Sequence, residues 1–464
     1  MVPFTISHLA AGLEAGEFSS REIVEQALKR IDESDATLKA WVTLAPEFAL
    51  AEADAADARR AAGRRLGPLD GIPYACKDLI DTKGVATTSS SKVLRGNVAT
   101  RDAGVVQRLR QAGAVMLGKT NTHEFAFGIL SPPTRNPWDA NTARTPGGSS
   151  GGTASAIAAG HVPFGLGTDT GGSIRIPAAL CGITGLKATM GRVPKDGVAV
   201  LTWSMDHVGP MCWTAADAAL VLNVLAGHSD ADSTTARRPI DDYTAKLDLP
   251  LQGIRAGVAV GYFTTHYPAI AAAFDKAVDD LRELGAETPE ISMPASLDLT
   301  QETGAGLNAE ASAWHGPRMR SQADDYAPDV RRWLKQGELV LATDYINARR
   351  NRARISADVR RIFDDHRLDV LLTPTVPTTA AAFDQDEYVA PDGFREPVMV
   401  ASLRGTWPFN LTGQPAVTVP CGFDDQGLPV GLQIASRPWD EATTLRVGHQ
   451  YQRVTDWHQR RPPA

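Results

Sequence analysis

Two serines set among glycines are the residues of this chain best suited to chemistry. Ser149 lies in TPGGSSGG, and Ser173 lies in GTDTGGSIR, 24 residues further along. Glycines tolerate positive φ and leave neighbouring backbone N–H groups uncrowded. A serine nucleophile needs that access, and an oxyanion hole needs free N–H donors. The two loops together therefore indicate nucleophilic catalysis by a serine.

A candidate base for such a serine is Lys77, which follows the apolar segment IPYAC. A lysine accepts a proton only when neutral, and its ordinary pKa is about 10.4, so folding must lower that pKa by about two to three units. Burial without a countercharge has this effect. Asp78 is adjacent, but in a strand its side chain points to the opposite face, so we expect no pairing with Lys77.

A second motif offers a different function, that of a nucleotide-binding protein. Residues 113–120, GAVMLGKT, match the P-loop pattern GxxxxGK[ST] from Gly113 to Thr120. A P-loop follows a strand and holds its four variable positions in a loop. Here a helical pattern precedes Gly113, and Ala-Val-Met-Leu is typical of a buried strand, whose amides bond to the sheet. The sequence therefore disfavours a phosphate site.

A third motif, GGSSG around Ser149, fits the GxSxG nucleophile elbow of α/β-hydrolases. That elbow needs an apolar strand directly before it. The preceding segment, NPWDANTARTP, is polar and broken by prolines. No histidine lies in a late, glycine-bounded loop where the base of such a triad is expected, so this alternative is also disfavoured.

The elements around these motifs predict an α/β protein. Ser19 and Glu22 form a capping box for a helix to about residue 33, and a second helix is expected over roughly 46–63. These define an N-terminal helical arm, 1–65, packed as one unit with a catalytic domain, 66–464. Strand–helix–strand alternation follows, through IPYACKDLI, AVMLGK and VPFGLGTD. It predicts a single large domain with a central mixed β-sheet covered by helices on both faces.

The C-terminal half continues this pattern with a less regular insertion. Helices are expected over 214–227 and 269–285, with a strand at VAVGYF between them. Residues 296–345 are expected to form helical insertions and loops that roof a cleft. Strands are expected again at DVLLTPTVP, AVTVPCGF and VGLQIAS.

Composition excludes several classes of function. The net charge of −7 gives no footprint for nucleic acid, and the arginines of 349–361 are interleaved with aspartates as on a solvated helix face. The four cysteines show no metal-ligand or disulfide spacing, so reduced thiols are expected. No apolar run approaches a membrane span, and the N-terminus lacks a signal-peptide pattern. We expect a cytoplasmic protein without membrane or nucleic-acid partners.

The motifs taken together resemble the amidase signature family of serine hydrolases, over nearly the whole chain. The resemblance is carried by GIPYACKDLID, GKTNTHEFAFG, PGGSSGGTASAIAAG, GTDTGGSIRIPAALCG and NLTGQPAVTVPCGF. It implies that Ser173 is the nucleophile, Lys77 the base, and Ser149 a bridging serine held by a cis peptide. It further implies an oxyanion hole formed by the backbone amides of Thr170, Gly171, Gly172 and Ser173, with Ser150, Asp169 and Arg175 bracing the site. Thr153 departs from the family serine but keeps a hydroxyl. No metal or organic cofactor is implied.

The resemblance fixes the reaction class more closely than the substrate. The pocket is expected from 123–136, 196–210, 300–345 and 380–410, whose aromatic residues favour an apolar or aryl amide or carbamate, as in an aryl amidase or urethanase. These aromatic residues are Phe125, Phe127, Trp203, Trp314, Trp333, Trp407 and Phe409. The alternative is the amidase component of a tRNA-dependent amidotransferase, which would need partner subunits. Dimers are common in the family, so a homodimer is one expected assembly.

Overall fold

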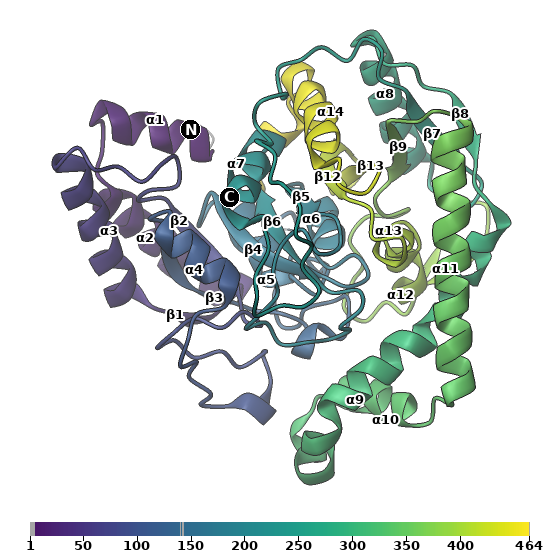
Figure 1. Cartoon of the computed structure of the whole chain (residues 1–464), viewed down its shortest axis with the longest axis horizontal. Helices are drawn as coiled ribbons and strands as arrows, with labels where there is room; N and C mark the ends of the chain where they lie inside the picture. The colour runs from purple at the N-terminus through teal and green to yellow at the C-terminus, as the bar shows by residue number, and fades with distance from the viewer. Residues whose placement is uncertain (1–4, 140, 142, 464) are drawn as a thin grey trace.

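A mixed β-sheet forms the centre of the molecule (Figure 1). The computed structural model describes residues 5–139, 141 and 143–463. Within that part of the chain the sheet has 11 strands in the order β1-β3-β2-β4-β6-β5-β12-β13-β9-β7-β8. The strands are β1 Trp41–Leu44, β2 Pro73–Lys77, β3 Val115–Thr120, β4 Phe164–Asp169, β5 Thr184–Lys187, β6 His207–Cys212, β7 Ala256–Val260, β8 Glu290–Ser292, β9 Val370–Pro374, β12 Ala416–Phe423 and β13 Pro429–Ser436. A separate hairpin joins β10 Glu387–Val389 to β11 Arg395–Pro397.

Helices cover both faces of this sheet, as the sequence predicted. They are α1 Ile6–Ala15, α2 Ser20–Leu38, α3 Pro46–Ala61, α4 Gly104–Gln111, α5 Gly151–Ala158, α6 Arg175–Cys181, α7 Ala215–Leu225, α8 Pro268–Glu283, α9 Gly304–Gln322, α10 Pro328–Glu338, α11 Ala342–Asp365, α12 Val398–Arg404, α13 Trp407–Leu411 and α14 Glu441–Val454. Short 3₁₀ segments in the described chain are η1 Lys92–Leu94, η2 Glu124–Ala126, η3 Ala295–Thr303, η4 Ala323–Asp325 and η5 Trp457–Gln459. Figure 1 shows α11 as a long helix along one edge of the molecule, with α9 and α10 at its lower end.

The N-terminal segment differs from the predicted helical arm in one element. The Ser19 and Glu22 capping box is present, and α2 begins directly after it. Between α2 and α3, however, β1 pairs antiparallel with β3 as an edge strand of the main sheet. Four half-exposed residues carry too short a pattern to identify a strand from sequence. The division at residue 65 stays a proposal.

The two disfavoured motifs lie in unsuitable backbone, as predicted. Gly113 closes the turn after α4, and Val115–Thr120 is the buried strand β3, paired with β1 and β2. Between β3 and α5, the residues described include no strand that could lead into a nucleophile elbow. The local structure thus provides neither a phosphate-binding loop nor a strand–turn–helix at Ser149.

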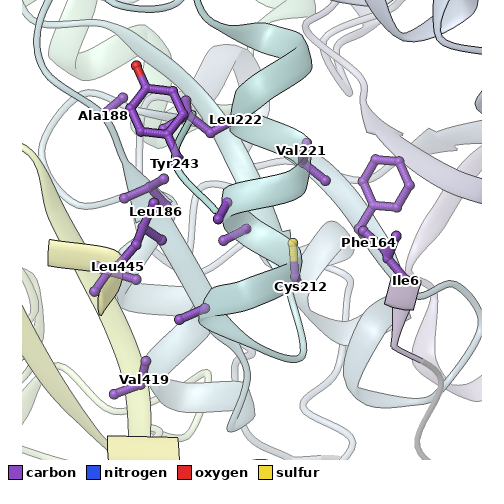
Figure 2. Packing of buried hydrophobic residues seen from close by; sticks show 14 of the residues in the cluster. Ile6, Phe164, Leu186, Ala188, Cys212, Val221, Leu222, Tyr243, Val419 and Leu445 are labelled. Atoms are coloured by element: carbon purple, nitrogen blue, oxygen red, sulfur yellow. The ribbon is translucent and has the colours of Figure 1, made fainter. Parts of the chain in front are cut away.

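The core lies between the sheet and its covering helices. Figure 2 shows Val221 and Leu222 of α7 among residues of neighbouring strands. Phe164, Leu186, Cys212 and Val419 come from β4, β5, β6 and β12 in turn, and Leu445 comes from α14. All are buried, so α7 and α14 anchor the strands whose ends carry the serine loops.

The C-terminal half follows the prediction closely. β9, β12 and β13 lie at the three predicted strands, and α7 and α8 lie within three residues of their predicted bounds. Residues 296–345 fold mainly into η3, α9 and α10, which confirms the helical insertion.

Candidate active site

Lys77 ends β2, a strand buried between β3 and β4. Its side chain is fully buried. Three hydroxyl oxygens surround its Nζ: those of Ser149 at 2.8 Å, Ser150 at 2.9 Å and Thr168 at 2.8 Å. The structure therefore brings the predicted base and the predicted bridging serine into direct contact.

Burial lowers the pKa of the Lys77 amine well below its ordinary value. The negative charges of Asp169 and Asp206 raise it, without offsetting the burial. Asp78 lies elsewhere, as predicted: its carboxylate accepts hydrogen bonds from the Thr88 hydroxyl at 2.6 Å and the Ser90 N–H at 3.0 Å. Lys77 is thus a buried amine among neutral hydroxyls, and such a site favours its neutral form.

The loop before α5 presents Ser149 and Ser150 to this amine. The peptide bond between Gly148 and Ser149 is cis, as the family resemblance implied. The Ser149 carbonyl accepts a hydrogen bond from the His123 N–H at 3.1 Å and another from the Ser131 hydroxyl at 2.9 Å. These contacts hold the loop against the segment that follows β3.

The second loop, Thr170–Ile174, joins β4 to α6 and carries Ser173. The Ser150 N–H donates to the Ser173 carbonyl at 3.2 Å, which joins the two serine loops. Gly172 has a φ of +142°, and a Cβ there would meet the Thr406 hydroxyl at 2.2 Å. Only glycine therefore fits at this turn.

Two features of this loop bear on its chemistry. Among the described residues, no protein acceptor takes the N–H of Gly171, Gly172 or Ser173. The Ser173 hydroxyl also makes no hydrogen bond to a described residue, so its link to Ser149 is not formed here. Catalytic hydrogen bonds commonly tighten only when substrate binds.

A buried ion pair braces the loop. Arg175 donates from Nε to Asp169 at 3.0 Å and from Nη2 at 2.9 Å, and Asp169 also accepts the Ile174 N–H at 3.2 Å. Burial alone would raise the pKa of Asp169, but Arg175 outweighs it and holds that pKa well below its usual range. Asn410 donates to the same carboxylate at 2.8 Å. The bracing roles inferred for Asp169 and Arg175 match this geometry.

We expect Arg175→Met to destabilise the fold by about 3–5 kcal/mol, because it leaves the Asp169 carboxylate buried without its countercharge. The free energy of unfolding in denaturant measures the loss. Arg395→Met is the matched control, since Arg395 pairs with Glu387 on the surface and its loss should cost less than about 1 kcal/mol. Equal losses in the two variants would contradict the bracing role.

Several site residues were missed from sequence. Thr168 contacts the Lys77 amine, the Thr406 hydroxyl donates to the Gly171 carbonyl at 2.6 Å, and the Thr170 hydroxyl donates to Asp206 at 2.6 Å. Strand alternation alone could have indicated Thr168, because in β4 it points to the opposite face from Asp169. Thr406 and Asp206 are distant in sequence and carry no local signal.

A cavity of about 260 Å³ lies beside Ser173, which lines it together with Thr170 and Gly171. All four predicted segments contribute to it, and Tyr262 joins from outside them. Its apolar wall includes Phe127, Ile129, Leu201, Leu307, Trp333 and Trp407.

The other four predicted aromatics are not among the lining residues. Phe125 and Trp314 pack against His315, Phe409 stacks on Phe263, and Trp203 is 48% exposed beside Lys195. These rings belong to the core or the surface, which sequence composition could not distinguish from a pocket wall.

Metal-binding, membrane-spanning and disulfide features can be assessed for the same part of the chain. Over the residues described, no group of three or more His, Cys, Asp or Glu side chains is placed to hold a metal ion. None of the described helices is long and apolar enough to cross a membrane. The four cysteines are buried and unpaired.

The fold and this site define an enzyme that acts on carbon–nitrogen bonds, and the family comparison agrees. A family model described as Amidase matches residues 22–445. The chain belongs to this amidase family.

Individual relatives divide between two activities. A subunit of the glutamyl-tRNA(Gln) amidotransferase of Chloroflexus aggregans is 45% identical over 486 aligned positions, covering 99% of this chain and 98% of the relative. A structure described as a vestigial protein complex that reveals the origins of an s-triazine catabolic enzyme is 36% identical, with a TM-score of 0.92 and coverage of 99% and 100%. A bacterial aryl acylamidase of the amidase signature enzymes is 26% identical, with a TM-score of 0.89 and coverage of 98% and 97%. The first of these names gives no support to the expectation that nucleic acid has no part in the function.

Proposed function

We propose that this chain hydrolyses an amide or carbamate through a Ser173–Ser149–Lys77 triad. The observation that carries the proposal is the buried Lys77 amine, 2.8 Å from the Ser149 hydroxyl and joined through that loop to Ser173. A neutral amine offers a lone pair to one of the hydroxyls around it. Ser149 then donates to Lys77 and accepts a proton from Ser173, once substrate draws the two serines together.

In the first step, the Ser173 oxygen bonds to the substrate carbonyl carbon. Its proton passes to Ser149, whose own proton passes to Lys77 Nζ. The carbonyl oxygen becomes an oxyanion, which the free N–H groups of Gly171, Gly172 and Ser173, together with that of Thr170, would stabilise.

In the second step, the carbon–nitrogen bond breaks. The proton returns from Lys77 through Ser149 to the departing nitrogen, which leaves as an amine or ammonia. Water then attacks the acyl-enzyme, gives its proton to the same relay and releases the carboxylic acid and free Ser173. A carbamate follows the same route and releases carbonic acid derivatives.

The cavity wall supports an uncharged apolar or aryl acyl group as the preferred substrate part. Phe127, Trp333 and Trp407 offer rings, and Leu201 and Leu307 offer aliphatic surface. Apolar surface gains free energy from an apolar acyl group and none from a charged one. This is the substrate pattern of an aryl amidase or urethanase.

The curated relatives support a second candidate more strongly: the amidase component of a tRNA-dependent amidotransferase. Eight glutamyl-tRNA(Gln) amidotransferase subunits are 42–45% identical to this chain over 99% of its length. In that role the chain would release ammonia from an amide donor and require partner subunits and a charged tRNA. A cytoplasmic location fits both candidates, and a homodimer fits the first.

A hydrolysis screen separates the two candidates. It would compare p-nitroanilides, primary amides, ureas and carbamates with glutamine and asparagine, which carry two charges beside the amide. For the first candidate we expect turnover of an apolar anilide or carbamate by the isolated chain, with kcat/KM at least about 100-fold above that for glutamine. Ammonia release from glutamine alone, or only with added partner subunits, would select the second. The Ser173→Ala variant is the background control for both.

A further inference from the structure

Arg404 is the one charged residue among those described that line the cavity beside Ser173. It ends α12, and its side chain is largely buried, at 16% exposure. Because charges interact strongly at such a site, the state of this guanidinium decides whether the cavity presents a net charge to a substrate.

Partners within the protein already occupy the Arg404 guanidinium. Its Nε donates to Glu396 Oε1 at 2.9 Å, and its Nη2 donates to Oε2 at 3.2 Å. Its Nη1 donates to the carbonyl oxygens of Tyr262 at 2.7 Å and Thr264 at 3.1 Å. Four of the five N–H donors of an arginine are thereby used. The paired Glu396 is itself only 12% exposed, so the two opposite charges neutralise one another with little help from solvent.

We propose that Glu396 sets the charge of the substrate: by neutralising Arg404, it restricts the cavity to acyl groups with uncharged ends. This inference rests on the proposed function. A carboxylate brought into the cavity would lose its hydration, find Arg404 already paired and face the like charge of Glu396. An uncharged acyl group meets none of these costs.

The same geometry makes the selectivity reversible by one substitution. Glu396→Gln removes the negative charge while keeping a carbonyl oxygen that can accept from Arg404. The guanidinium then carries an unopposed charge at the cavity wall, and its planar fork suits a carboxylate. We therefore expect this variant to accept acyl groups that end in a carboxylate.

Two chromogenic substrates test the proposal: adipoyl p-nitroanilide, which ends in a carboxylate, and its uncharged isostere 6-methylheptanoyl p-nitroanilide. For the wild type we expect kcat/KM to favour the uncharged substrate by at least about 100-fold. In Glu396→Gln we expect that preference to fall by about 10-fold or more, mainly through a lower KM for the adipoyl substrate. An unchanged preference in a folded Glu396→Gln variant would overturn the inference.

Two further variants identify the cause. Glu387→Gln removes the same charge from β10, which pairs with the strand of Glu396, but Glu387 binds the surface residue Arg395 and does not line the cavity. It should leave the preference unchanged. The double variant Glu396→Gln/Arg404→Gln has no cation to attract a carboxylate, so it should lose the gain of the single variant. Persistence of the gain in the double variant would contradict a role for Arg404.

The wild-type measurement needs no variant to fold, and it separates this inference from the proposed function. Equal turnover of the two anilides, abolished by Ser173→Ala, would overturn the role of Glu396 and leave the serine mechanism standing. Turnover that persists in Ser173→Ala, or none of either anilide, would overturn the proposed function and this inference with it.

Discussion

Replacing Ser173 with alanine is expected to lower kcat/KM by about 10⁴-fold or more while leaving the fold intact. The change removes the attacking oxygen. It should cost little stability, because the Ser173 hydroxyl makes no hydrogen bond to any described residue and the side chain lies at the edge of a cavity. We expect the free energy of unfolding to change by less than about 1 kcal/mol. Hydrolysis of the best substrate from the screen, with a denaturation curve, measures both effects.

Ser356→Ala is the matched control for this experiment. Its hydroxyl only bonds back to the Arg352 carbonyl within α11, at 2.8 Å, and to the Leu411 carbonyl at 3.4 Å, and it does not line the cavity. It should retain full activity. Wild-type rates in Ser173→Ala would remove the serine from the mechanism.

Covalent labelling distinguishes the two serines. Ser173 lines the cavity, whereas Ser149 is fully buried beneath it, against Lys77. A fluorophosphonate probe should therefore modify Ser173, as mapped by mass spectrometry. An adduct on Ser149 would restore the nucleophile elbow as the explanation of this loop.

The catalytic centre could be predicted from sequence because its chemistry depends on a few local signals. The glycines around Ser149 and Ser173 mark loops, and the apolar run before Lys77 marks a buried strand. Adjacent parallel strands then bring β2 and β4 together, so the lysine and the serine loops meet at the ends of those strands. Even the direction of Asp78 followed from the two-residue period of a strand.

The surroundings of the centre could not be predicted, because they depend on contacts between distant parts of the chain. Arg175 bonds to the Thr406 carbonyl and to Gln433, more than two hundred residues away. Local patterns do not encode such pairings. The cavity wall was predicted only by segment, since a ring such as Phe125 in the core and one such as Phe127 in the cavity have the same composition around them.

Replacing Lys77 with methionine is expected to lower kcat/KM by at least about 10³-fold, because the relay from Ser173 through Ser149 loses its acceptor. Methionine keeps most of the length of the side chain and suits an apolar site. In the wild type, activity requires the neutral amine, so kcat/KM should rise with pH through the pKa of Lys77 and then level off. Burial lowers that pKa, so the rise should lie well below the range of an exposed lysine. A wild-type rate that climbs only near about pH 10 would contradict a buried neutral base.

The same residue should reveal itself in stability, by an effect independent of catalysis. Between the lowered pKa of Lys77 in the folded protein and its ordinary value of about 10.4, the unfolded chain holds one more proton at this site than the folded chain. The free energy of unfolding should therefore rise with pH in that window, by up to about 1.4 kcal/mol per pH unit from this group. Lys77→Met removes the contribution, so its stability should rise less steeply than that of the wild type from about pH 7 to about pH 9. Because the measurement needs no substrate, parallel stability curves for the two proteins would show that Lys77 is charged in the folded state, and a charged lysine cannot be the base.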